Sequence, residues 1–175
     1  AVFDIKADVA LTVYGEMSLD KIHEKFMKAD FIYVGGGDTV FMLEHWKKSG
    51  MLAFIKEAYD RGVLICGLSA GAICWFETMY TDSKTIGTED QYSLFPGLGW
   101  IRGTISPHYN VRLLDFDQKI KYNNKDAIGL EDCCAIEIVN GRIIHSIGGK
   151  GKAFYLFRNA NNEFTREEIL PRINV

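Results

Sequence analysis

The stretch that decides the fold reads Val63-Leu64-Ile65-Cys66-Gly67-Leu68-Ser69-Ala70-Gly71 and continues into the helix-like segment 72–76. A strand that turns sharply into a helix around a serine lifts the hydroxyl out of the sheet. Gly67 and Gly71 leave out the Cβ atoms that would collide at such a turn. The pattern predicts Ser69 as a nucleophile, whereas the simpler alternative is a serine that caps an ordinary helix.

On both sides of this turn, short apolar runs alternate with amphipathic segments. This alternation predicts an α/β fold, with a mostly parallel sheet and helices on both of its faces. An Asn-Gly pair between two strand-like runs predicts a β-hairpin near the C-terminus. The glycine-rich, aromatic segment 79–103 is expected to be a loop that could close over a site. The expected strands are 10–13, 31–34, 63–66, 101–105, 127–130, 135–139, 142–147 and 153–157, and the expected helices are 18–27, 39–49, 51–61 and 112–122.

The composition narrows the class of protein. A chain of 175 residues with 47% hydrophobic residues can bury one sizeable core, so residues 1–175 are expected to form one domain. The net charge of −3 and the scattered Lys and Arg residues argue against nucleic acid or an anionic membrane as a partner. No apolar run reaches the roughly 20 residues that span a bilayer, and the start lacks a secretory signal. These observations predict a cytoplasmic protein.

The four cysteines do not form a metal-binding pattern. Cys66, Cys74, Cys133 and Cys134 lie within or beside apolar segments, without Cys-x-x-Cys or Cys/His spacing. Free, buried thiols are the better interpretation, and they fit a reducing cytosol. We therefore expect neither a metal nor a cofactor.

One histidine is placed to serve as a general base. His108 follows a predicted strand and comes directly after Pro107, which restricts the backbone there. His45 and His145 are more easily explained as structural residues on a helix and in the hairpin. The sequence therefore favours His108 as the base that takes a proton from Ser69.

The acid that would orient this base has three candidates. Glu131 and Asp132 follow the predicted strand 127–130, at the carboxyl edge of the sheet. Asp82 lies after the helix that follows Ser69 and would give the order serine, acid, histidine. Because triads occur in several chain orders, order alone does not decide among them, and each could be a solvated surface carboxylate.

The glycine run Gly35-Gly36-Gly37 follows another predicted strand. It lacks the lysine of a phosphate-binding loop and the spacing of a dinucleotide-binding loop. It does bring a bare backbone amide close to Ser69. We hypothesise that the amides of Gly36 and Ala70 form an oxyanion hole.

Three motifs together resemble one family. The segments Tyr33-Val34-Gly35-Gly36-Gly37-Asp38-Thr39, Gly67-Leu68-Ser69-Ala70-Gly71-Ala72 and Pro107-His108-Tyr109-Asn110 are similar to those of the serine peptidases that include aspartyl dipeptidase (dipeptidase E) and cyanophycinase. The resemblance implies a fold related to class I glutamine amidotransferases. It also implies hydrolysis next to aspartate, of Asp-X dipeptides in one branch and of β-Asp-Arg in the other.

Carried over to this sequence, the resemblance assigns Ser69 as the nucleophile and His108 as the base. The cyanophycinase pattern points to Asp132 as the acid, and the dipeptidase pattern points to the region of Asp82; we prefer Asp132. Members of the family begin with further strands and a helix, so the resemblance also implies that N-terminal residues are missing from this sequence.

The substrate would need a cationic or donor-rich pocket for its acidic side chain. Arg102 and Arg112, which flank His108 in the sequence, are the nearest candidates. The sequence thus predicts a small peptide as the partner and leaves a homodimer open. An isopeptide hydrolase and a ligand-binding protein without turnover are the alternatives.

Overall fold

The computed structural model describes residues 4–15, 17–83, 92–122 and 125–172. Helices and strands alternate through the first two thirds of the chain, and strands alone follow. In chain order the elements are α1 (Leu19–Lys28), β1 (Phe31–Val34), α2 (Thr39–Ser49), α3 (Met51–Asp60), β2 (Leu64–Gly67), α4 (Ala70–Ile73), β3 (Phe76–Thr81), β4 (Ser93–Pro96), β5 (Ile101–Pro107), α5 (Tyr109–Lys121), β6 (Ala127–Leu130), β7 (Cys134–Val139), β8 (Arg142–Gly148), β9 (Ala153–Arg158) and β10 (Phe164–Ile169).

The parallel strands form the centre of the fold. β1 and β2 pair in parallel, and a six-stranded sheet has the order β10-β9-β6-β5-β3-β4. Within it β3, β5 and β6 are parallel, whereas β4, β9 and β10 are antiparallel to their neighbours. The short helix α4 contacts β1 and β2 as well as β3 and β5, and so it joins the two groups of strands.

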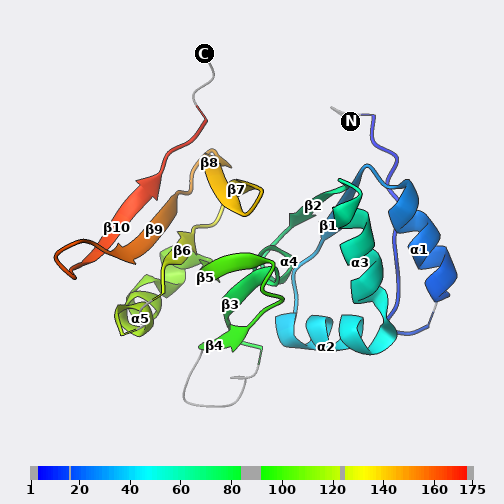
Figure 1. Cartoon of the computed structure of the whole chain (residues 1–175), viewed down its shortest axis with the longest axis horizontal. Helices are drawn as coiled ribbons and strands as arrows, with labels where there is room; N and C mark the ends of the chain where they lie inside the picture. Colours follow the sequence, from blue (N-terminus) through cyan, green and yellow to red (C-terminus); the bar gives the residue numbers. More distant parts are fainter. Residues whose placement is uncertain (1–3, 16, 84–91, 123–124, 173–175) are drawn as a thin grey trace.

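Helices lie on opposite sides of these strands. α3 lies beside β1 and β2, with α1 and α2 in contact with it, and α5 lies on the other side of the molecule against β5 and β6 (Figure 1). The larger hydrophobic cluster includes Trp46, Ile55, Phe76 and Ile105, and a smaller one forms around Tyr80 and Phe116. The expected α/β architecture with helices on both faces is therefore confirmed.

Local sequence explains where the first helices begin and end. The Ser18 hydroxyl accepts a hydrogen bond from the backbone of Lys21 at the start of α1. The Asp38 carboxylate does the same for the Phe41 amide at the start of α2. Gly50 ends α2 with a φ of 83°, a left-handed conformation that glycine adopts without strain.

Several expected elements are confirmed almost residue for residue. β1 and β6 have the predicted bounds, and the C-terminal hairpin is formed by β7 and β8. Its turn residues Asn140 and Gly141 have φ values of 52° and 73°, and positive φ at both positions is what the Asn-Gly pair predicts.

Other expectations are wrong. Residues 10–13 form no strand, and the helix after Ser69 spans only the four residues of α4 before β3 begins at Phe76. β3 and β4 occupy part of the segment that was expected to be a loop, and residues 84–91 of that segment lie outside the described residues. β10 was not expected at all, because its charged residues hide the alternation of an edge strand.

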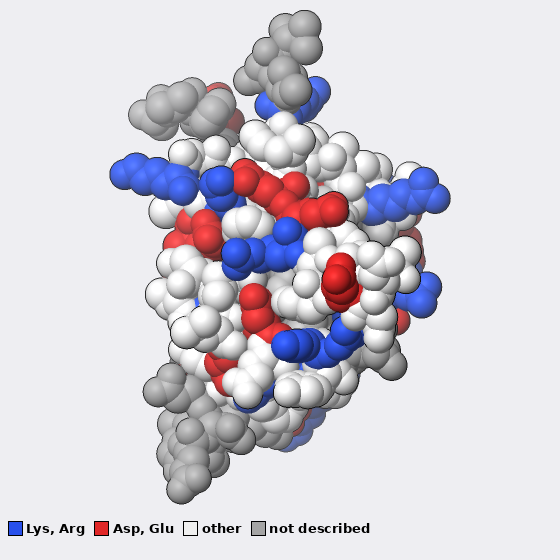
Figure 2. Space-filling view, turned by 90° about the vertical axis from the view of Figure 1, so that its left-hand side faces the viewer, with Lys and Arg blue, Asp and Glu red and all other residues white. Residues whose placement is uncertain are grey.

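β10 exposes charged side chains of both signs. Arg166, Glu167 and Glu168 are exposed on this edge strand, and Lys152 lies 2.7 Å from the Glu168 carboxylate. Figure 2, which faces the side of β9, β10 and α5, shows Lys and Arg interspersed with Asp and Glu. Charges on an edge strand discourage pairing with a strand of another molecule.

β1 is apolar along its whole length, but only alternate residues of it are buried. Ile32 and Val34 are buried, whereas Phe31 and Tyr33 are 44% and 57% exposed. Leu64, the partner of Phe31 on β2, is 62% exposed. The reason is that α1 and α3 cover one face of the pair, and no described element covers the other.

Replacing Gly71 with alanine should destabilise the protein strongly. A Cβ at this position would lie 2.2 Å from the Val34 carbonyl oxygen, so the backbone of β1 or of α4 would have to move. We expect the free energy of unfolding to fall by about 3 kcal/mol or more. Urea denaturation measures this change. Gly149→Ala is the matched control, because nothing lies within 4 Å of its Cβ, and an equal effect of both substitutions would contradict the prediction.

Candidate active site

Ser69 lies at a strained turn between β2 and α4. Its backbone has a φ of 50° and a ψ of −111°, which a residue with a side chain rarely adopts. A Cβ on Gly67 would lie 1.9 Å from the carbonyl oxygen of Gly71, so the two flanking glycines are required for the chain to turn this tightly. Such a conformation costs on the order of 1–3 kcal/mol, and it is found where a functional group must be held in place.

His108 reaches this hydroxyl from the end of β5. Its Nε2 lies 2.9 Å from the Ser69 Oγ, although the two residues are 39 positions apart in the chain. His108 is the N-cap of α5 and also has a positive φ, of 53°. Pro107 precedes it at the end of the strand, as the sequence analysis noted. The structure thus brings the predicted nucleophile and the predicted base into hydrogen-bonding contact.

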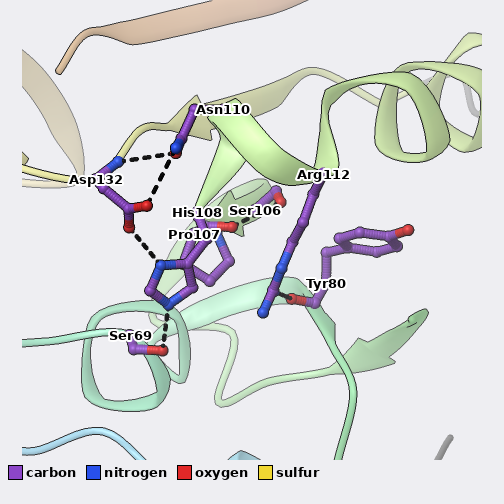
Figure 3. Close-up of polar contacts among 8 residues, drawn as sticks. All are labelled: Ser69, Tyr80, Ser106, Pro107, His108, Asn110, Arg112 and Asp132. Atoms are coloured by element: carbon purple, nitrogen blue, oxygen red, sulfur yellow. Dashed lines mark hydrogen bonds and ion pairs between the residues drawn. The ribbon is translucent and has the colours of Figure 1, made fainter. Parts of the chain in front are cut away.

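Asp132 completes a chain of hydrogen bonds with these two residues. Its Oδ1 lies 2.5 Å from the Nδ1 of His108, on the side of the ring opposite Ser69 (Figure 3). Hydrogen bonds from His108 and from Asn110 lower the pKa of the Asp132 carboxyl below its ordinary value. Asp132 is therefore ionised at neutral pH and can accept the Nδ1–H of the imidazole.

The other two candidate acids have different surroundings. Glu131 accepts a hydrogen bond from the backbone amide of Lys152 at 2.9 Å, which holds the turn after β6 against the start of β9. Asp82 is exposed and follows β3 directly. Both ring nitrogens of His108 are engaged by Ser69 and Asp132, so the structure brings neither Glu131 nor Asp82 to the imidazole.

The backbone of Gly36 and that of Ala70 lie next to Ser69. A Cβ built on Gly36 would lie 3.4 Å from the Ser69 Cβ, so the glycine run approaches the nucleophile closely. Ala70 follows Ser69 and is the first residue of α4. Among the described residues, neither amide has a hydrogen-bond acceptor. Neither amide is therefore committed to another acceptor, and both stay candidates for an oxyanion hole.

A methyl group at Gly36 should slow the peptide hydrolysis that the sequence leads us to expect, without unfolding the chain. The added Cβ would contact the Ser69 Cβ at 3.4 Å, an ordinary distance. We expect the methyl group to crowd the space beside the amide in which an oxyanion would lie. We expect Gly36→Ala to lower kcat about 100-fold, about as much as the loss of one oxyanion-hole donor, because the methyl group would keep the oxyanion away from the amide. Steady-state kinetics with an unchanged melting temperature would support this role, and an unaffected kcat would refute it.

The two candidate arginines are at different places. Arg102 is exposed near the start of β5, and six residues of strand put it about 20 Å from the end of β5 that carries His108. The structure therefore does not bring Arg102 to the site. Arg112 lies one helical turn after His108 and is only 9% exposed (Figure 3).

The guanidinium of Arg112 is held in a fixed position. It donates a hydrogen bond to the Tyr80 carbonyl oxygen at 3.2 Å and lies over the ring of Tyr92, 4.3 Å from its centroid. Its Nε is buried and has no partner among the described residues. An orientated guanidinium with unused hydrogen-bonding capacity can bind a carboxylate.

The remaining sequence expectations concern metals, cysteines and membranes. The described residues contain no cluster of His, Cys, Asp or Glu that could hold a metal ion. The cysteines are free thiols, but only Cys74 is buried and Cys133 is exposed, so the expectation of four buried thiols is wrong for Cys133. Within the described part of the chain no helix has the length and apolar character needed to cross a bilayer.

Asn110 contacts the site in a way that the sequence analysis did not predict. Its side chain forms two hydrogen bonds with Asp132. In the sequence, Asn110 is visible only as the last residue of the motif Pro107-His108-Tyr109-Asn110. Its position two residues after the histidine was the available signal, but a contact with Asp132 depends on the packing of α5 against the turn after β6.

Comparison with known proteins identifies relatives of this chain. Uncharacterized peptidase YgaJ from Bacillus subtilis (strain 168) is 34% identical over 134 residues, which cover 73% of this chain and 55% of that protein. Peptidase E from Citrobacter koseri is 31% identical over 105 residues, covering 60% and 45% respectively. The chain thus spans about half the length of these curated relatives.

A solved structure is also similar. It belongs to a protein provisionally described as peptidase E from Listeria monocytogenes EGD-e, with a TM-score of 0.57 and 29% identity. The match covers 77% of this chain and 67% of that one, and it supports the expected glutamine amidotransferase-like fold. Residues 4–146 match the sequence description of peptidase family S51. The chain belongs to peptidase family S51.

Proposed function

We propose that this chain carries the catalytic centre of a serine peptidase that hydrolyses small peptides next to an acidic residue. The observation that supports the proposal most directly is the chain of hydrogen bonds from Ser69 through His108 to Asp132. A nucleophile, a base, and a group that orients the base are the parts that acyl transfer requires. Membership of peptidase family S51 supports the same reaction class.

In the first half of the reaction, Ser69 Oγ attacks the carbonyl carbon of the peptide bond. The Nε2 of His108 accepts the hydroxyl proton, and Asp132 stabilises the imidazolium that forms. The negative charge that develops on the carbonyl oxygen is stabilised by the amides of Gly36 and Ala70. His108 then donates its proton to the leaving amine, which leaves an acyl group on Ser69.

In the second half, water replaces the amine. His108 accepts a proton from the water, whose oxygen attacks the acyl carbon and forms a second tetrahedral intermediate. Collapse of this intermediate releases the carboxylic acid and returns the proton to Ser69 Oγ. The site as proposed performs both steps with side chains and backbone amides alone.

Arg112 is our candidate for selecting the substrate. Its guanidinium is fixed by Tyr80 and Tyr92 and lies on the same side of α5 as His108 (Figure 3). A carboxylate on the substrate would pair with it in a partly buried setting, where charge-assisted hydrogen bonds are strong. The motifs that resemble those of aspartyl dipeptidase make Asp-X dipeptides the substrates to test first.

A second candidate function is hydrolysis of β-aspartyl isopeptides. The observation that favours it is that the acid in contact with His108 follows the histidine in the chain, as in the cyanophycinase pattern, and does not precede it. A screen of Asp-X, Glu-X and β-Asp-Arg dipeptides separates the two functions. The screen should be preceded by labelling with a fluorophosphonate, which reacts with an activated serine.

The labelling also tests the general proposal. We expect a single label on Ser69, and no label on Ser69→Ala. Ser49→Ala, at the end of α2, is the control that should label normally. A folded chain that takes up no label would favour a ligand-binding protein without turnover.

Replacement of Arg112 should change substrate preference more than the chemistry. We expect Arg112→Met to raise KM for an acidic substrate about 10- to 100-fold, since a charge-assisted pair is lost. The rate of fluorophosphonate labelling should change less than about threefold, because the probe carries no carboxylate. Arg102→Met, at the far end of β5, is the matched control. Equal effects of the two variants on KM would contradict the role of Arg112.

A further inference from the structure

Asn110 lies in the first turn of α5 and contacts Asp132 twice. Its Nδ2 donates to the Oδ2 of Asp132 at 3.1 Å, and its Oδ1 accepts from the Asp132 backbone amide at 3.1 Å (Figure 3). A backbone amide can only donate, and an ionised carboxylate can only accept. The two partners therefore fix which end of the Asn110 amide faces which atom.

The two oxygens of the Asp132 carboxylate have different partners. Oδ1 lies against the imidazole of His108, and Oδ2 accepts from Asn110. The Asp132 side chain is 48% exposed, so water can compete for both oxygens. A second fixed donor restricts rotation of the carboxylate, which a single hydrogen bond to His108 would leave free.

The backbone around Asp132 is held from another direction. The Glu131 amide donates to the Lys152 carbonyl oxygen at 3.0 Å. A Cβ on Gly151 would lie 1.9 Å from the Asp132 carbonyl oxygen, so the chain before β9 packs directly on this turn. These contacts fix the backbone of the turn, and they leave the plane of the carboxylate to be set by His108 and Asn110.

We propose that Asn110 is a positioning residue that acts through Asp132, by holding the carboxylate where it accepts a hydrogen bond from the Nδ1–H of His108. The inference rests on the proposed function, since it concerns the orientation of the base in that reaction. His108 and Asn110 belong to the same turn at the start of α5. The base and the side chain that orients its acid therefore keep a fixed relation to each other.

The test is a double-mutant cycle between Asn110 and Asp132. The rate constant of fluorophosphonate labelling and kcat/KM are measured for the wild type, Asn110→Ala, Asp132→Ala and the double variant. We expect Asn110→Ala to lower both quantities about 10- to 100-fold, the range for lost hydrogen bonds to a charged group, with KM nearly unchanged. In the Asp132→Ala background the same substitution should change them less than about threefold.

Two further measurements separate positioning from a general structural effect. Leu114→Ala, an 83% exposed position on the same helix, should leave the rates unchanged. NMR titration of the Asp132 carboxyl carbon without substrate should show a higher pKa in Asn110→Ala, because one group that favours the ionised form is gone.

The outcomes distinguish this inference from the proposed function. A wild-type rate in Asn110→Ala, an equal loss in both backgrounds, or an unmoved carboxyl titration would each overturn the role of Asn110. If the wild type takes up no label and cleaves no peptide, the proposed function fails. The carboxyl titration would still report whether Asn110 acts on Asp132.

Discussion

Replacing Ser69 with alanine should lower kcat for peptide hydrolysis by more than about 10⁴-fold, with the protein still folded. The alanine removes the nucleophile, and only the amides of Gly36 and Ala70 and the binding of the substrate remain to assist attack by water. Kinetics on the best peptide from the substrate screen measures the loss. A Ser69→Ala variant that retained turnover within tenfold of the wild type would show that another residue is the nucleophile.

Replacing Ser69 with glycine should lower kcat as much as replacing it with alanine does, but the glycine variant should be more stable than the alanine variant. Ser69 has a φ of 50° and a ψ of −111°, which glycine adopts far more easily than alanine. We expect Ser69→Gly to unfold with a free energy on the order of 1 kcal/mol higher than Ser69→Ala. Thermal and urea denaturation of the two inactive variants side by side measures this difference, which isolates the strain at the turn from the chemistry.

Replacing Asp132 with asparagine should lower kcat/KM by about 10⁴-fold. The Oδ1 of Asp132 lies 2.5 Å from the Nδ1 of His108, where it accepts a hydrogen bond from Nδ1–H and so leaves Nε2 unprotonated and free to act as the base towards Ser69. An asparagine can turn its N–H group towards Nδ1 and favour the wrong tautomer, and it carries no charge to stabilise the imidazolium. Most of the loss should be in kcat, because Asp132 acts on His108 and is not expected to contact the substrate.

The controls for this prediction are the two rival acids. Asp82→Asn and Glu131→Gln should each lower kcat/KM by less than about tenfold, because neither carboxylate contacts His108. If Asp82→Asn proved the more damaging change, the acid would come from the segment after β3. Fluorophosphonate labelling of all three variants gives the same ranking without a peptide substrate.

The rivalry between these acids shows what the sequence could not decide. β5 carries His108 at its carboxyl end, and its two neighbours in the sheet are β3 and β6. Asp82 follows β3 and Asp132 follows β6. The order of strands in the sheet therefore places one carboxylate on each side of the histidine. Which one reaches the imidazole depends on the turn after each strand and on side-chain contacts such as that of Asn110.

Local signals were predicted well because short-range sterics cause them. The glycines around Ser69 and the Asn-Gly turn each follow from the conformation of a few adjacent residues. The two arginines show that separation along the chain does not by itself predict separation in space. Arg112 is four residues from His108 on a helix and therefore lies within one turn of it. Arg102 is six residues from His108 along a strand and therefore lies at the other end of β5.

Long-range pairing was harder to predict. β10 pairs with β9 across a short turn, but its sequence Phe-Thr-Arg-Glu-Glu-Ile has apolar residues only at its ends. β3 was hidden because it begins at Phe76, the last residue of the helix-like run 72–76, and its sequence Phe-Glu-Thr-Met-Tyr-Thr mixes polar and apolar residues. In both cases tertiary packing decided the conformation against an ambiguous local pattern.

Ser69, His108 and Asp132 come from three segments separated by 39 and 24 positions in the chain. No short piece of the polypeptide holds all three, so an unfolded or partly assembled chain has only an ordinary, unreactive hydroxyl. Uptake of a fluorophosphonate during refolding from urea would therefore time the moment at which β2, β5 and β6 come together. On the proposed mechanism, a newly made chain would therefore have no hydrolytic activity towards its neighbours until folding is complete.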